Sequence, residues 1–132
     1  MESKFHFEQL EIWQKSIDFA AYIIRLTEEI PFKRNHFRLI EQLEFAVISI
    51  AANIAEGATR TSPNEYLQCL SIAKGSLAEL EYYLHLVKRL GYIDQSQELP
   101  LRQLHVQTAK TLHGLLVFVR QSREKESFSL VH

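Results

Sequence analysis

The chain has a single cysteine, Cys69, among its 132 residues. One cysteine excludes an internal disulfide framework, which suits a protein of a reducing compartment. No stretch of about 18 apolar residues occurs, so the sequence predicts no membrane-spanning helix. The first residues lack the basic-then-apolar order of a secretory signal, and we therefore expect a cytoplasmic protein.

The chain also lacks an excess of charge of either sign. Its formal net charge is −1, which gives no overall attraction to nucleic acid or to a membrane surface. Apolar residues make up 46% of the sequence, an ordinary share for a globular protein. At this length the chain is one domain that is large enough to bury a core.

Only four glycines and three prolines are present, and most of them separate segments with helical periodicity. The segments predict helices at about 8–30, 38–56, 63–90 and 98–122, and no strand pattern competes with them. Short connections make neighbouring helices antiparallel. We therefore expect an all-α, up-down-up-down four-helix bundle over residues 1–122, followed by a flexible C-terminal tail over residues 123–132.

The connection between the second and third predicted helices has the clearest local signals. Gly57 suits the left-handed position just past a helix end. Ser62 can cap the next helix, Pro63 fits its first position, and Glu65 completes a capping box. This region indicates a tight helical hairpin.

Several polar residues lie near this hairpin, where little water is expected. Buried polar groups are normally satisfied by one another, so we expect a structural hydrogen-bond cluster, with a catalytic carboxylate pair as the alternative. Gly75, inside the third helix, is expected to allow close helix contact. The predicted cluster consists of Asn53, Glu56, Arg60, Ser76 and Glu79.

The first two predicted helices carry more apolar residues than a bundle core needs. In the first helix one stripe is formed by Leu10, Trp13, Ile17, Ala20 and Ile24. A second stripe, displaced by about 125° at helical pitch, is formed by Ile12, Phe19, Ile23, Leu26 and Ile30. The second helix is apolar nearly all round. Since exposed apolar patches usually mark interfaces, we expect a homo-oligomer that uses the second stripe; the alternative is a cover provided by the tail or by long side chains.

The sequence offers no complete catalytic or metal-binding set. The six histidines form no ligand pattern, and the best local pair, Glu81 with His85, is expected to be a contact within one helix. Cys69 is expected to be a core residue. We therefore predict no catalytic residues, no metal and no cofactor, and we expect that the protein is not an enzyme.

Basic residues gather in two places, the first inter-helix connection and the fourth helix. Such residues could contact RNA, DNA or a protein partner, and a solvated helix face is the alternative. The candidates are Lys33, Arg34, Arg38, Arg102, Lys110 and Arg120.

These segments together resemble the bacterial four-helix bundle family of ribosomal RNA intervening-sequence proteins, which includes the accessory protein of diversity-generating retroelements. The similarity extends over residues 7–92. The matching segments are Phe7–Lys15, Gln42–Leu43, Ala46–Ile50, Asn53–Gly57, Tyr66, Leu70–Glu81 and Leu90–Tyr92.

The resemblance implies a non-enzymatic bundle that assembles into a ring of five, and a role linked to nucleic acid for some members. The expected function is therefore a homo-oligomeric, pentameric scaffold or adaptor. The alternative is a nucleic-acid-binding accessory protein that uses the basic connection and the fourth helix. Glu44 and Phe45 stand where the family tends to have basic residues, which favours the scaffold.

Overall fold

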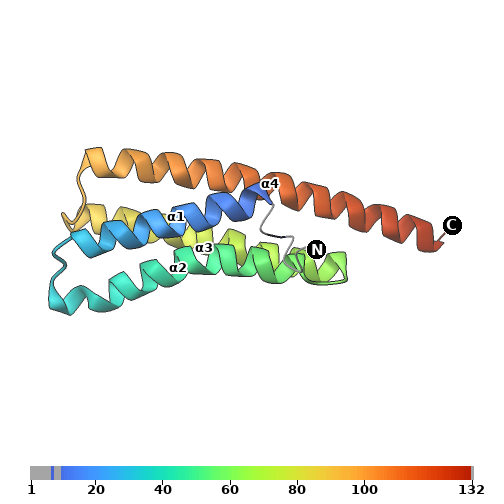
Figure 1. Ribbon diagram of the computed structural model, residues 1–132, viewed down its shortest axis with the longest axis horizontal. Helices are drawn as coiled ribbons and strands as arrows, with labels where there is room; N and C mark the ends of the chain where they lie inside the picture. Colours follow the sequence, from blue (N-terminus) through green and yellow to red (C-terminus); the bar gives the residue numbers. More distant parts are fainter. Residues whose placement is uncertain (1–6, 8–9, 132) are drawn as a thin grey trace, which may run out of the picture.

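The computed structural model describes Phe7 and residues 10–131, with side chains described to Glu126. Four α-helices and one short 3₁₀ helix account for nearly all of this part, and it contains no strand (Figure 1). The elements are α1 (Glu11–Glu29), η2 (Arg34–His36), α2 (Phe37–Ala58), α3 (Pro63–Arg89) and α4 (Gln95–Val131). The predicted all-α class is confirmed. The expected first residues of helix 1, 8 and 9, lie outside the described part.

The four helices form an antiparallel bundle in which each helix packs against two neighbours (Figure 1). Helix α1 contacts α2 and α4, and α3 contacts the same two helices, whereas diagonal pairs do not touch within the described residues. The pair α3–α4 therefore lies on the opposite side of the bundle from the pair α1–α2. The largest fully buried side chains include Phe19, Ile23, Ile50, Ile54, Leu70, Leu80, Leu101, Leu112 and Leu116.

Helix α4 begins earlier than the sequence patterns indicated, at Gln95 rather than at about residue 98. The Oδ1 atom of Asp94 accepts a hydrogen bond of 2.9 Å from the Gln97 amide, and Gln97 Oε1 accepts one of 3.0 Å from the Asp94 amide. This reciprocal arrangement is a capping box that uses Asp and Gln, and it satisfies two amides at the helix start.

The other end of α4 also differs from the expectation. Residues 123–131 continue the helix to Val131, where a flexible tail was predicted, and residue 132 lies outside the described part. The last turns extend past the ends of the other helices (Figure 1). No glycine or proline follows Gly114, so nothing in the sequence stops the helix there.

Gly57 lies within α2 rather than in a left-handed turn after it, which corrects the expectation from the sequence. Its importance is the close approach of α3, because a Cβ at this position would lie 2.9 Å from the Cβ of Cys69. The predicted cap of α3 is confirmed: Pro63 begins the helix, and Ser62 Oγ accepts a hydrogen bond of 3.4 Å from the Glu65 amide.

Tyr92 lies in the segment between α3 and α4 and contacts the segment between α1 and α2. Both segments are at the left end of the bundle in Figure 1. The Tyr92 ring packs against Phe32, with 4.4 Å between the ring centroids. Its hydroxyl accepts a hydrogen bond of 3.2 Å from the Lys33 amide and also contacts Nδ1 of His36. These contacts fix the segment that carries three of the candidate basic residues.

Candidate functional site

The stripe predicted as an oligomer interface belongs to the core of the single chain. Ile12, Phe19 and Ile23 are 2%, 0% and 1% exposed, so no partner can reach them. Leu26 and Ile30 are half-buried and pack against the same core. The assignment was therefore wrong. The periodicity of α1 defines two stripes, but it does not say which of them faces the other helices.

Part of the remaining stripe of α1 and the outer side of α2 form an exposed apolar surface instead, whereas Ala20 of that stripe belongs to the core. Ile17 is 40% exposed, whereas Phe45 and Ile48 on α2 are 63% and 46% exposed. Thr27 Oγ1 donates a hydrogen bond of 2.9 Å to Glu44 Oε1, which sets the register of the two antiparallel helices. About one turn away from this hydrogen bond, Ile24, three residues before Thr27, is level with Ile48, four residues after Glu44. We call this surface the α1–α2 outer face, formed by Trp13, Ile17, Ile24, Phe45, Ile48 and Ala52.

The predicted polar cluster is only partly formed. Asn53 Nδ2 donates hydrogen bonds of 2.8 Å and 3.0 Å to the carbonyl oxygen and the Oγ of Ser49. The Ser49 and Ser76 hydroxyls are 2.8 Å apart, which joins α2 to α3. Asn53 and Ser76 therefore belong to one interhelical network, through a serine that the prediction left out.

The charged members of the predicted cluster lie elsewhere. Glu56 forms an exposed ion pair with Arg60, which lies just past the end of α2. The hydroxyl of Tyr83 donates a hydrogen bond of 3.1 Å to the exposed carboxylate of Glu79. Because Glu56 and Glu79 engage different partners at the surface, the five residues do not converge, and the two glutamates do not form a catalytic pair.

The six candidate basic residues lie in two separate regions. Lys33, Arg34 and Arg38 are exposed around η2, at one end of the bundle. The other three are exposed along α4, where Arg102 and Arg120 are 18 positions apart, or about 27 Å along the helix. Arg102 also forms an ion pair with Glu98. The structure therefore does not bring the six residues into one compact site.

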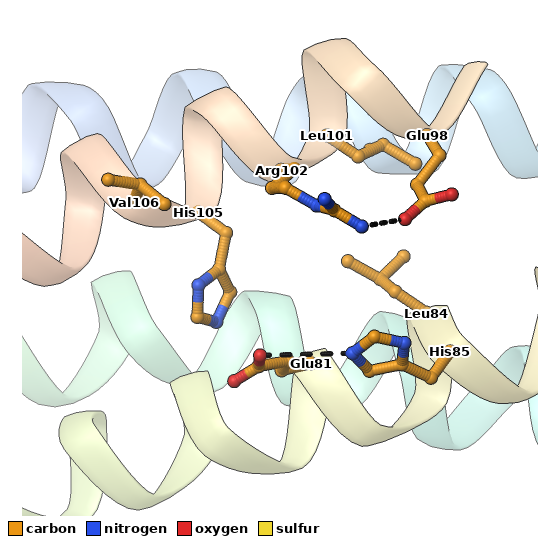
Figure 2. Close-up of a pocket in the computed structure, with 8 residues that line it drawn as sticks. All are labelled: Glu81, Leu84, His85, Glu98, Leu101, Arg102, His105 and Val106. Carbon is orange, nitrogen blue, oxygen red and sulfur yellow. Dashed lines mark hydrogen bonds and ion pairs between the residues drawn. The ribbon is translucent and has the colours of Figure 1, made fainter. Parts of the chain in front are cut away.

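Helices α3 and α4 enclose a pocket of about 230 Å³ that the sequence did not indicate (Figure 2). Helix α3 contributes three of its lining residues and α4 contributes five. Leucine and valine side chains lie beside the polar groups. The lining residues are Glu81, Leu84, His85, Glu98, Leu101, Arg102, His105 and Val106.

The charged groups of this pocket are paired across and along the helices. Glu98, whose side chain is 13% exposed, contacts both Lys88 of α3 and Arg102 of α4. The hydrogen bond from Lys88, aided by the charge of Arg102, lowers the pKa of the Glu98 carboxyl below its ordinary value. Glu81 Oε1 lies 3.8 Å from His85 Nε2, as the sequence predicted for this pair.

His105 is held in one orientation at the middle of the helix pair. Its Nε2 lies 2.7 Å from the carbonyl oxygen of Leu77. Since a carbonyl oxygen only accepts, Nε2 carries the hydrogen. The ring also meets Phe19 edge-on at a centroid distance of 6.4 Å. No group of three or more potential ligands is placed to hold a metal ion in the part of the chain that is described.

Among the helices that the structure describes, none combines the length and the apolarity needed to cross a membrane.

Among curated proteins, none matches this chain. A crystal structure of a protein of unknown function from the S23 ribosomal protein family of Bacteroides thetaiotaomicron is similar, with 28% sequence identity and a TM-score of 0.73. The similarity covers 80% of this chain and 97% of that protein. The family model described as 23S rRNA-intervening sequence protein matches residues 8–114, and the chain belongs to that family.

Proposed function

We propose that this protein is a non-enzymatic, cytoplasmic scaffold or adaptor that assembles with copies of itself through the α1–α2 outer face. The observation that carries this proposal is the exposure of Phe45, Ile48 and Ile17 on one side of the bundle. Large apolar patches on a folded chain usually mark interaction surfaces. The family resemblance supports a ring of five as the assembled form.

Sedimentation equilibrium over a range of micromolar concentrations tests this proposal. The expected mass is close to five times that of one chain, independent of the loading concentration. A mass equal to one chain throughout the range contradicts self-assembly. A stable dimer or trimer contradicts the ring of five but retains the scaffold.

Nucleic-acid binding is the second candidate function, favoured by the surroundings of η2. Lys33, Arg34 and Arg38 make no ion pair within the described residues, and Phe37 beside them is 62% exposed. Cations can contact phosphates, and an exposed ring can stack on a base. Labelled single-stranded RNA and duplex DNA, titrated at low and physiological salt, test this. Binding that weakens with salt and is lost in an Arg34→Gln, Arg38→Gln variant supports it, and no binding at low salt excludes it.

A further inference from the structure

The pocket in Figure 2 is the middle of a longer groove between α3 and α4. It shares Glu98 and Arg102 with a neighbouring pocket towards the start of α4. It shares Glu81 and His105 with another pocket in the opposite direction. The three pockets extend from Gln95 to Leu116 along α4. At the helical rise this stretch is about 30 Å long, the length of a helix of about 20 residues.

Apolar side chains line the α3–α4 groove in its middle and towards Leu116, whereas the end at the start of α4 is lined mainly by polar residues. Small side chains at Ala78 and Ala109 leave room in one half. Of the residues that line the groove, Leu99 and Val106 are 57% and 43% exposed. The accessible apolar lining residues are Ala78, Leu84, Val106 and Ala109, and beneath them lie the buried side chains of Leu77, Leu101, Leu112 and Leu116.

Two pairs of cationic or protonatable side chains line the groove at different levels. His85 and Arg102 line one level, and Lys74 and His113 line the other. The two levels are 11 residues apart on each helix, which corresponds to about three helical turns, or 16 Å.

Both acidic groups of the groove have partners within the chain. Lys88 and Arg102 both contact Glu98, and His85 faces Glu81. Lys74 and His113 make no ion pair within the described residues. Since two cations share Glu98 and Lys74 has no acidic partner in the described part of the chain, the charge that the groove offers to a partner is positive.

We propose that the α3–α4 groove binds an acidic amphipathic helix of another protein. The apolar stripe of that helix lies on the apolar lining of the groove, and carboxylates 11 residues apart meet the two basic levels. This inference gives the class of partner that the proposed adaptor would bind, so it rests on the proposed adaptor function. It uses none of the residues of the α1–α2 outer face. Since the two surfaces are on opposite sides of the bundle, an assembly would present one groove per copy.

The probe that tests the proposal is a fluorescein-labelled helical peptide of about 20 residues, the length that fits the groove. It carries leucines along one stripe and glutamates 11 positions apart on the flanks, and a matched peptide has glutamines in their place. Fluorescence anisotropy on the full-length protein should show at least tenfold tighter binding of the acidic peptide at pH 7.5. Equal binding of the two peptides overturns the proposal.

A double variant, Lys74→Gln with Arg102→Gln, locates the binding site. It should bind the acidic peptide about tenfold more weakly, because each level of the groove loses a fixed cation. The matched control is Lys110→Gln, on the exposed side of α4 outside the groove, which should change binding less than twofold. Equal affinity of the double variant and the wild-type protein, or displacement of the peptide by a uridine-rich RNA oligomer, overturns the proposal.

The oligomeric mass of the same samples separates this proposal from the proposed assembly. Peptide binding by a monomeric protein supports the groove and rejects the scaffold. An assembled protein that does not distinguish the two peptides rejects the groove alone. Far-UV circular dichroism melts of each variant confirm that the exposed substitutions leave the fold intact.

Discussion

A Cβ atom at Gly57 would lie 2.8 Å from Cδ1 of Tyr66, closer than side chains pack in folded proteins. The second helix can approach the third only because residue 57 has no side chain. The interhelical serine network is formed further along the same pair of helices, between Ser49 and Ser76. The glycine thus permits α3 to pack closely against the end of α2.

Substitution of Gly57 by alanine should destabilise the protein by about 1–3 kcal/mol, because the tyrosine ring and the neighbouring helix must move. The control is Gly75→Ala, on the exposed side of α3, where a Cβ would have no neighbour within 4 Å. That control should stabilise the helix by about 0.5–1 kcal/mol. Urea denaturation measures both. Similar effects at the two positions would contradict the packing argument.

Removal of the cap of α4 by Asp94→Ala should cost about 1 kcal/mol. The cap is also sensitive to pH. Hydrogen bonds from the Ser96 hydroxyl and the Gln97 amide lower the pKa of Asp94 below its ordinary value of 3.8. A lowered pKa in the folded state gives stability above that ordinary value, and the stability is lost as the pH falls through the folded-state pKa.

Thermal melts between pH 7 and pH 3 therefore distinguish this cap from a neutral one. Asp94→Asn keeps a capping oxygen that does not titrate, so its melting temperature should fall less steeply below pH 4 than that of the wild-type protein. Parallel pH profiles of the two proteins would show that the Asp94 carboxylate does not stabilise the start of α4.

The polar groups near the α2–α3 hairpin should contribute very unequally to stability. Asn53→Ala removes two hydrogen bonds from the partly buried network and should cost about 1–3 kcal/mol. Glu56→Ala removes an exposed ion pair with Arg60 and should cost less than about 0.5 kcal/mol. Urea denaturation of both variants provides the comparison. A larger cost at Glu56 than at Asn53 would restore the single cluster that the sequence suggested.

The sequence predicted the number and order of the helices, and it located the start of α3, because that end depends on local signals. Ser62, Pro63 and Glu65 specify the start of α3 within four residues of chain. The sequence analysis placed the start of α4 at about residue 98, although Asp94 and Gln97 have the spacing of a capping box.

The surfaces were harder to predict, because they depend on how the helices are rotated and aligned. Phe19 and Ile17 lie in two stripes of α1 that periodicity treats alike, and only packing against the other helices buries one of them. The α3–α4 groove depends on the antiparallel register that brings His85 to the level of Arg102. Spacing within either helix does not contain that information.

The claim that the α1–α2 outer face drives assembly is tested most directly by sedimentation equilibrium of one variant pair. Phe45→Glu with Ile48→Glu places two carboxylates on this face, and both residues are exposed in the single chain, so the fold should persist. Tyr82→Glu, on an equally exposed position of α3, is the control. The account predicts five copies for the wild-type protein and the control, and one copy for the double variant. A double variant that retains the wild-type mass would contradict it.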